Sequence, residues 1–214
     1  MKEYDIILIP QSWNWEYQPT GETLTRIEVA GRTCYKSEDK ITETSAENFV
    51  KKLINRGHMS VIEHSFASIK IITSRGISHE LVRHRLASYS QSSSRYINYK
   101  KKGIEIIIPE WIGRGREKNK QDLNKHRVNI WEKSIEESIR GYLNLLKTGL
   151  RPEDARGVLP IDLKTEVIIS ANLREWRHIL KLRTSKGAHP QMKQLMKQVL
   201  AGFKQAIPCI FNDL

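Results

Sequence analysis

Apolar positions along the chain follow two periods, and each change of period marks a predicted element. Residues 5–9 form a short apolar run, and apolar and polar side chains alternate over residues 66–71, which is typical of strands. Between them, residues 22–36 and 44–57 carry apolar side chains three and four positions apart, which indicates two helices. Thr44 begins the second helix with a capping-box pattern, because a glutamate follows three positions later.

The next predicted helix carries a cluster of candidate functional residues. Ile77, Leu81 and His84 lie on neighbouring turns of it. Residues 83–85 therefore fall near its C-terminal end, where the helix dipole favours cations. We expect the serines of residues 90–94 in the loop that follows.

The second half of the chain has mainly helical periodicity. The predicted elements are a buried strand at 104–108, a long helix at 122–147, a short helix after Pro152 that holds Arg156, and helices at 173–183 and 191–203. Residues 167–172 fit either a strand or a helix. The pattern predicts an α+β fold, a single helix-rich domain of residues 1–214 around a small mixed or antiparallel sheet.

Composition places the chain among globular proteins. Its 214 residues are 39% hydrophobic, with 12 Gly and 7 Pro, enough to bury a core without disulfides or metals. Cys34 and Cys209 form no CxxC pair, so neither a zinc site nor a disulfide framework is predicted. Pro208-Cys209 weakly resembles the nucleophile of folate-only thymidylate synthases, but its apolar surroundings favour a buried, unreactive thiol.

The net charge of +12 indicates an anionic partner without identifying it. Nucleic acid is one candidate, although the lysines are spread along the chain and no zinc-finger, RRM or KH signature is present. The start of the chain has a short apolar run interrupted by Asp5 and no small-residue cleavage site, and no apolar stretch is long enough to span a membrane. We therefore expect a cytoplasmic protein that does not bind a membrane, and the absence of these signatures makes nucleic acid the less favoured partner, so none is predicted.

The sequence RHRLASYSQSSSRY, residues 83–96, concentrates cations beside hydroxyl groups. Guanidinium groups so close together repel one another unless solvent or an anion relieves the repulsion. The planar donors of arginine suit phosphate, and serine hydroxyls can donate to its remaining oxygens or to a heterocycle. A solvated basic helix end followed by a serine-rich turn would give the same composition.

This segment resembles the RHR-x7-S motif of the flavin-dependent thymidylate synthases, in which the last serine is followed by x-Arg-Tyr. Ser93, Arg95 and Tyr96 occupy those places. The resemblance extends from about residue 23 to 201 through three further elements. These are His58–His64, similar to H-x-[ST]-x-x-E-H, Ala155–Pro160, similar to AR-x-x-LP, and a block formed by Asn172 with Leu182–Arg183.

The resemblance implies reductive methylation of dUMP to dTMP, with FAD as cofactor and with 5,10-methylenetetrahydrofolate and NADPH as co-substrates. It also implies a homotetramer with shared active sites. To methylate C5 of uracil, an enzyme adds a thiolate at C6 or stabilises an anion made at N3. Because no convincing thiolate is present, N3 ionisation is expected, and the resemblance assigns it to Arg183 as the catalytic residue.

The same resemblance implies two sets of ligand-binding residues. For dUMP they are Glu80, Leu81, Val82, Arg83, Gln91, Ser92, Ser93, Ser94, Arg95, Arg156 and Arg183. For FAD they are His58, Ser60, Arg83, His84, Arg85, Gln91, Asn172 and His178. Three positions depart from the motif of some members, which have Gln in place of Glu80, Glu in place of Gln91 and Asn in place of His178.

Two alternative chemistries are less favoured by the residues. Ser93 has no adjacent base in the sequence, so phosphate binding is preferred to a nucleophilic role. The histidines do not show a metal-binding spacing such as H-E-x-x-H, so no metal site is predicted. A non-enzymatic nucleic-acid-binding module and a family member that binds nucleotide without catalysis both remain open.

Overall fold

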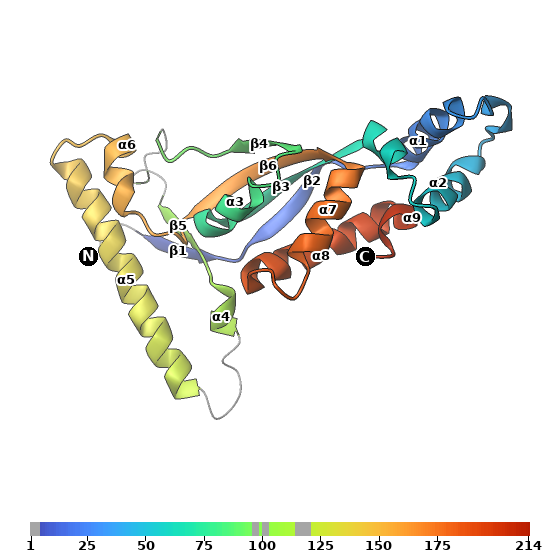
Figure 1. Ribbon diagram of the computed structural model, residues 1–214. Helices are drawn as coiled ribbons and strands as arrows, with labels where there is room; N and C mark the ends of the chain where they lie inside the picture. The colour runs from blue at the N-terminus through green and yellow to red at the C-terminus, as the bar shows by residue number, and fades with distance from the viewer. Residues whose placement is uncertain (1–4, 96–98, 100–102, 114–120) are drawn as a thin grey trace. The chain divides into compact units, whose positions relative to one another are not determined.

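The computed structural model describes residues 5–95, 99, 103–113 and 121–214, so Tyr96 of the motif lies outside the described residues. The chain divides into two compact units, and each is described by itself. The first unit consists of Met1–Ser12, Ile72–Leu81 and Gln91–Val167, and the second of Trp13–Ile71, Val82–Ser90 and Ile168–Leu214. Helices predominate over a small sheet, which confirms the predicted α+β class (Figure 1).

The described elements, in chain order, are β1 (Ile6–Ile9), β2 (Ser12–Tyr17), α1 (Gly21–Thr33), η1 (Glu38–Lys40), α2 (Ser45–Asn55), η2 (Met59–His64), β3 (Phe66–Ser74), α3 (Arg75–Leu81), β4 (Ala87–Gln91), β5 (Ile104–Ile107), α4 (Glu110–Gly113), α5 (Gln121–Lys147), α6 (Pro152–Ala155), η5 (Arg156–Val158), β6 (Lys164–Asn172), α7 (Leu173–Arg183), α8 (Pro190–Ala206) and α9 (Pro208–Phe211). The η segments are 3₁₀ helices.

Four strands form one sheet in the order β2-β3-β6-β4. β3 and β6 run antiparallel, because the N–H of Leu173, after the end of β6, donates to the carbonyl of Ser65, before the start of β3. The hydroxyls of Ser68 and Ser170 face each other across this pair at 2.7 Å. β1 and β5 form a separate parallel pair in which Ile6 lies opposite Ile104.

The core of the first unit lies between β5 and α5. Ile104 and Ile106 of β5 are fully buried against Ile139 and Tyr142, which belong to the apolar stripe predicted for the long helix. Gly103, just before β5, has a φ of 74°, a conformation that favours glycine. This core supports β6 at the point where the serine-containing segment pairs with it, since Ser92 N–H donates to the carbonyl of Glu166.

The core of the second unit packs α7 and α8 against aromatic side chains of the sheet. Trp176 of α7 is fully buried and its indole N–H donates to the carbonyl of Ala67 on β3 at 2.9 Å. Phe203 of α8 contacts the rings of Trp15, Trp176 and Phe211, with centroids 4.7 to 5.0 Å apart. α7 is thus held firmly along its buried face.

Most predicted elements are confirmed, with shifts of a few residues at their ends. Leu173–Arg183 is helical with the predicted bounds, and the ambiguous stretch 167–172 is part of strand β6. Gly57 ends α2 with a φ of 75° as its N–H donates to the carbonyl of Ile54. Strand β2 was not predicted.

Three predictions are wrong. α3 ends at Leu81, so residues 83–85 lie in the turn after the helix and the helix dipole does not explain their charge. The serine-containing segment does not begin in a loop, because β4 extends to Gln91. Thr44 precedes α2 without a side-chain cap, and Ser45 instead accepts from the N–H of Thr42 and donates to Glu28.

Within the described residues, no helix combines the length and the apolar character needed to cross a membrane.

Candidate functional site

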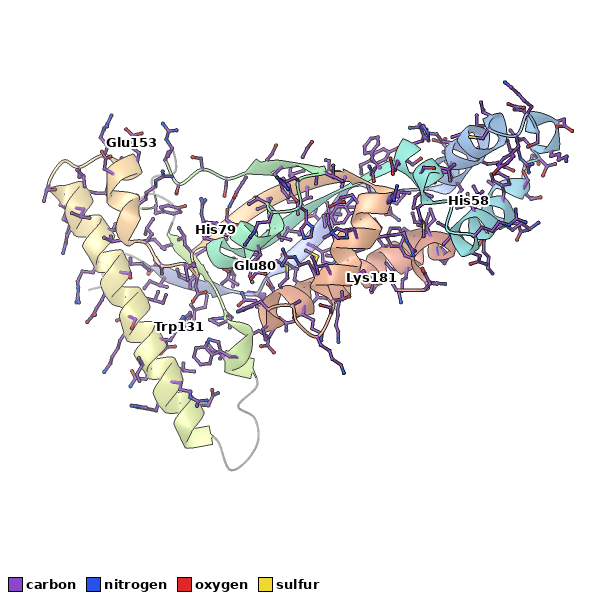
Figure 2. All side chains as sticks on the ribbon, viewed as in Figure 1. His58, His79, Glu80, Trp131, Glu153 and Lys181 are labelled. Carbon is purple, nitrogen blue, oxygen red and sulfur yellow. The ribbon has the colours of Figure 1, made fainter. Side chains whose placement is uncertain are left out.

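The residues predicted to bind ligands fall in both units. In the first unit are Glu80 and Leu81 at the end of α3, Gln91 at the end of β4, Ser92 to Arg95 after it, and Arg156 in η5. In the second unit are His58 and Ser60 at η2, Val82 to Arg85 after α3, and Asn172, His178 and Arg183 on α7. Figure 2 labels His58 and Glu80 at these places.

In the second unit, three of the predicted residues meet in what we call the His84 cluster, formed by His84, Glu175, His178 and Arg183. Nε–H of Arg183 donates to Nε2 of His84 at 2.9 Å. Nδ1 of His84 lies 3.7 Å from Oε1 of Glu175, and the His178 ring stands edge-on to His84 with centroids 5.8 Å apart. Tyr89 donates its hydroxyl to the His84 carbonyl at 3.0 Å, which ties β4 to the cluster.

His84 is held in its neutral form. Burial, and to a lesser extent the neighbouring Arg183 and His178, together lower its pKa to about 4. A neutral imidazole whose Nε2 accepts a hydrogen bond must carry its proton on Nδ1, as we assign from the hydrogen-bond network. The acceptor nitrogen therefore faces Arg183, and the N–H side faces Glu175.

α7 supplies three members of the His84 cluster because its start and buried face are both fixed. Oδ1 of Asn172 accepts from the N–H of Glu175 at 2.8 Å and so caps the helix. Arg183 occupies the last helical position, where the helix dipole favours a cation. The anchoring of Trp176 in the core then fixes the rotation of α7 about its axis, and with it the directions in which these polar side chains point.

The donor atoms of His84, Glu175 and His178 all lie within 4.8 Å of one another, close enough to hold a metal ion. The guanidinium of Arg183 is bonded to His84 in the same cluster, and it would repel a divalent cation bound there. The cluster thus suits a ligand that accepts hydrogen bonds from Arg183 better than it suits a metal.

Arg83 and Arg85 flank the buried His84 and are themselves exposed. Within the described residues, neither guanidinium has a carboxylate at ion-pair distance. Each therefore offers its donors to solvent or to an anion. The motif predicts arginine side chains that can reach an anion, and here they lie in a turn rather than at a helix end.

In the first unit, a second group brings Ser94, Arg95 and Arg156 together. A terminal nitrogen of Arg156 donates to Oγ of Ser94 at 3.0 Å, and its Nε donates to the carbonyl of Glu153. Arg95 lies 3.6 Å from the Glu153 carboxylate, on α6 (Figure 2). Oγ of Ser93 accepts from the N–H of Arg95, so the segment after β4 is ordered around two guanidinium groups.

The backbone and the hydroxyl of Ser92 are hydrogen-bonded within the protein itself. Its N–H donates to the carbonyl of Glu166, its Oγ accepts from the N–H of Glu166, and its carbonyl accepts from Arg75 at 2.8 Å. Its hydroxyl also shares a hydrogen bond with Thr165 at 3.0 Å. Ser92 therefore anchors the segment to β6 in this structure.

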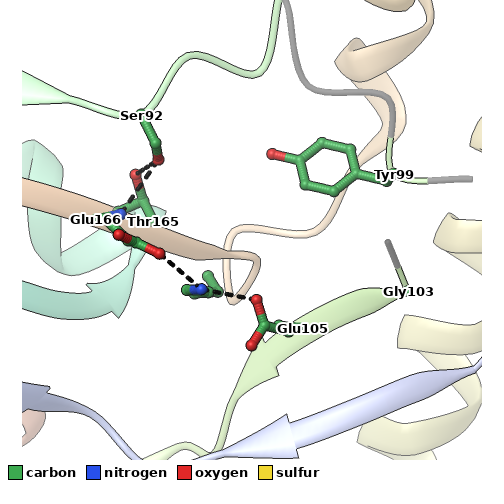
Figure 3. Close-up of a pocket in the computed structure, with 7 residues that line it drawn as sticks. Ser92, Tyr99, Gly103, Glu105, Thr165 and Glu166 are labelled. Atoms are coloured by element: carbon green, nitrogen blue, oxygen red, sulfur yellow. Dashed lines mark hydrogen bonds and ion pairs between the residues drawn. The ribbon is translucent and has the colours of Figure 1, made fainter. Parts of the chain in front are cut away.

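Ser92 also borders a small cavity of about 170 Å³, shown in Figure 3, whose other lining residues are Tyr99, Gly103, Glu105, Lys164, Thr165 and Glu166. Nζ of Lys164 lies 2.7 Å from Glu105 and 2.8 Å from Glu166. Burial disfavours the charge on Lys164, but these two hydrogen bonds outweigh it and raise its pKa. With its cation already neutralised, the cavity does not suit an anionic group.

Comparison with known proteins covers the part of the chain that contains both clusters. A sequence model of the family described as thymidylate synthase complementing protein matches residues 17–209. The chain belongs to this family.

Three relatives, each named a flavin-dependent thymidylate synthase, illustrate the similarity. The protein of Geobacter sulfurreducens is 32% identical over 203 residues, covering 92% of this chain and 84% of its own length. That of Corynebacterium efficiens is 32% identical over 213 residues, covering 95% and 84%. That of Pyrococcus furiosus is 34% identical over 185 residues, covering 84% and 72%.

The sequence motifs named part of these clusters in advance, and the structure adds residues that the motifs do not contain. Glu175 and Tyr89 lie beside His84, and Ser78, Thr165 and Arg75 hold the end of β4. Glu175 could have been found from its place three residues after the capping Asn172. Thr165 and Ser78 have no local signal, because their role depends on strand pairing.

Proposed function

We propose that the chain is an FAD-dependent thymidylate synthase that converts dUMP to dTMP. Methylenetetrahydrofolate would donate the one-carbon unit and leave as tetrahydrofolate, and NADPH would be the reductant. The observation that carries this proposal is the family match over residues 17–209, together with relatives named flavin-dependent thymidylate synthases. The pairing of Arg183 with a neutral His84 supports the proposed way of activating uracil.

In this proposal Arg183 is the catalytic residue. A guanidinium beside the uracil stabilises the negative charge that develops when N3 loses its proton, and this makes C5 nucleophilic. His84 accepts from Nε of Arg183, which fixes the plane of the guanidinium at the last turn of α7. No cysteine is needed, and the Cys209 thiol has its pKa raised to about 11 by burial, which keeps it protonated.

The phosphate of dUMP would be bound by arginines and serines from the motif. Arg156, Ser94 and Arg95 already form one ordered group, and exposed Arg83 supplies a further guanidinium. Glu80, Leu81, Val82, Gln91, Ser92 and Ser93 complete the proposed nucleotide-binding set. Since the hydrogen bonds of Ser92 are used within the protein, its proposed part is to hold the segment in place.

The chemistry of the residues around His84 fits FAD. The diphosphate of FAD is an anion of the kind that guanidinium groups bind, and Arg83 and Arg85 are exposed beside the His84 cluster. His58, Ser60, Gln91, Asn172 and His178 are the further proposed contacts. Bound and reduced by NADPH, the flavin would supply the hydride that converts the transferred methylene group into the methyl of dTMP.

We further propose that the chain is one functional domain that assembles as a homotetramer with shared active sites. β3, β4 and β6 each contain residues of both compact units, which supports a single domain. Exposed apolar side chains, among them Leu86 and the stacked pair Tyr17 and Phe66, supply surface that subunit contacts would bury.

The proposal is tested by the absorbance spectrum of the purified protein with added FAD, followed by titration with dUMP. We expect a bound-flavin band that dUMP perturbs. Absence of flavin binding, with steeply salt-dependent binding to single-stranded or duplex DNA instead, would favour the nucleic-acid-binding alternative.

A further inference from the structure

The amide of Gln91 is oriented by two buried hydroxyl groups. Its Nε2 lies 2.9 Å from Oγ of Ser78 on α3 and 3.0 Å from Oγ1 of Thr165 on β6. Ser78 is 0% and Thr165 1% exposed, so bulk solvent does not compete for either hydroxyl.

The protons in this network can be assigned one by one. Oγ of Ser78 donates its only hydrogen to the carbonyl of Arg75 at 2.9 Å, so towards Gln91 it can only accept. The amide atom facing Ser78 must therefore be Nε2, which excludes the flipped amide. Its second hydrogen is accepted by Thr165. Both amide hydrogens of Gln91 are thus used within the protein.

The carbonyl Oε1 is then the one polar atom of the Gln91 side chain left to face a ligand, and it can only accept. Within the described part of the chain, no protein donor is bonded to it. We propose that Ser78 and Thr165 are positioning residues that make Gln91 an obligate acceptor for an N–H or O–H group of the bound nucleotide.

This inference rests on the proposed function, because it takes Gln91 to lie beside dUMP. It accounts for the departure at this position, where some family members have Glu. A glutamate offers acceptor oxygens, and a glutamine whose two hydrogens are both bonded to buried hydroxyls offers an acceptor as well. The two residues would then recognise the same donor, one with charge and one without.

The experiment compares the binding of dUMP with that of two analogues, N3-methyl-dUMP, which lacks the N3 hydrogen, and 2′,3′-dideoxyuridine monophosphate, which lacks the 3′-hydroxyl. Affinities are measured by calorimetry on the FAD-loaded protein. We expect one analogue to bind the wild type at least about tenfold more weakly than dUMP, since an unmade buried hydrogen bond is costly. The Gln91→Ala variant should lose that discrimination. Gln91→Glu should keep it, because the Ser78 hydroxyl can turn to donate to one carboxylate oxygen while the other still accepts from the nucleotide.

The positioning role is tested by Ser78→Ala combined with Thr165→Val, which frees the amide to turn. Discrimination against the same analogue should fall several-fold in this double variant. The single variant Thr165→Ser keeps the hydroxyl and should discriminate as the wild type does. Unchanged discrimination in the double variant, or in Gln91→Ala, would overturn the inference while leaving the enzyme assignment intact. A wild type that binds neither FAD nor dUMP would instead overturn the proposed function on which the inference rests.

Discussion

Nε of Arg183 donates a hydrogen bond to Nε2 of His84 over 2.9 Å, so two residues that could both be cations form a donor–acceptor pair. The pair depends on a neutral imidazole, and burial, together with the neighbouring Arg183 and His178, provides it by lowering the pKa of His84 to about 4. The central histidine of the motif thus acts on the guanidinium proposed to activate uracil, in addition to its proposed contact with FAD.

Substitution of His84 tests this pairing. His84→Phe keeps a planar ring but removes the acceptor, and we expect kcat for dTMP formation to fall about tenfold or more because the guanidinium loses its fixed orientation. His84→Gln, whose amide oxygen can accept from Arg183, should lose less activity. Steady-state assays at saturating dUMP measure both, and equal losses in the two variants would argue against the pairing.

The stability of the protein should depend on pH through His84. Its ordinary pKa of 6.5 applies to the unfolded chain, and in the folded protein the pKa is about 4. Between these values the unfolded state binds more protons, so the free energy of unfolding decreases as pH falls from about 6.5 to 4. The loss amounts to at most about 3 kcal/mol at the acid end of this range.

Urea denaturation at several pH values measures this loss. Among the described residues, the groups facing the imidazole are Arg183, His178 and Glu175, and the Tyr89 hydroxyl is bonded to the His84 carbonyl. His84→Phe removes the titrating group and serves as the control, because its unfolding free energy should change less over the same range. A wild type and a variant with parallel pH profiles would show that His84 is not held neutral.

Cys209 should be dispensable. Burial, with Glu47 nearby, raises the pKa of its thiol to about 11, so very little thiolate exists near neutral pH. We expect Cys209→Ala to retain turnover within about twofold, and iodoacetamide to alkylate the exposed Cys34 first. Loss of turnover in a folded Cys209→Ala variant would instead indicate a cysteine nucleophile.

Gly202 should not tolerate a side chain. A Cβ at this position of α8 would overlap Cη2 of Trp13, and overpacking of this kind costs about 1–3 kcal/mol. Gly141→Ala in α5 is the matched control, since its Cβ would be 3.8 Å from Val158 and it should stabilise the helix by up to about 1 kcal/mol. Thermal unfolding distinguishes them, and similar effects of the two substitutions would contradict this packing.

The spacing of apolar residues along the chain correctly predicted those helices in which the buried side chains recur at a regular helical spacing. The stripe containing Ile135, Ile139 and Tyr142 gave the long helix, and α7 has the predicted bounds. α3 ends earlier than its apolar spacing suggests, because the imidazole of His84 is bonded to Arg183, a residue 99 positions away. Strand β2 was not predicted, although Trp13 and Trp15 alternate there with polar residues.

In the candidate site, too, residues that are neighbours in the sequence could be predicted, whereas residues that only the fold brings together could not. The motif residues were found because they are clustered in sequence, as with Arg83 to Arg85. Ser78 and Thr165 were not, because a buried serine or threonine becomes significant only when the fold brings it to Gln91. Ser92 was expected to contact dUMP, and its atoms prove to be bonded to β6 and Arg75.

The most direct test of the account is dTMP formation by the Arg183→Ala variant. The assay supplies dUMP, methylenetetrahydrofolate, NADPH and FAD, and bound flavin is measured by absorbance on the same sample. We predict turnover by the wild type and a loss of at least about 100-fold in kcat for the variant with its flavin retained, because the charge at N3 is no longer stabilised. A variant with turnover close to that of the wild type would contradict the claim that Arg183 activates the uracil.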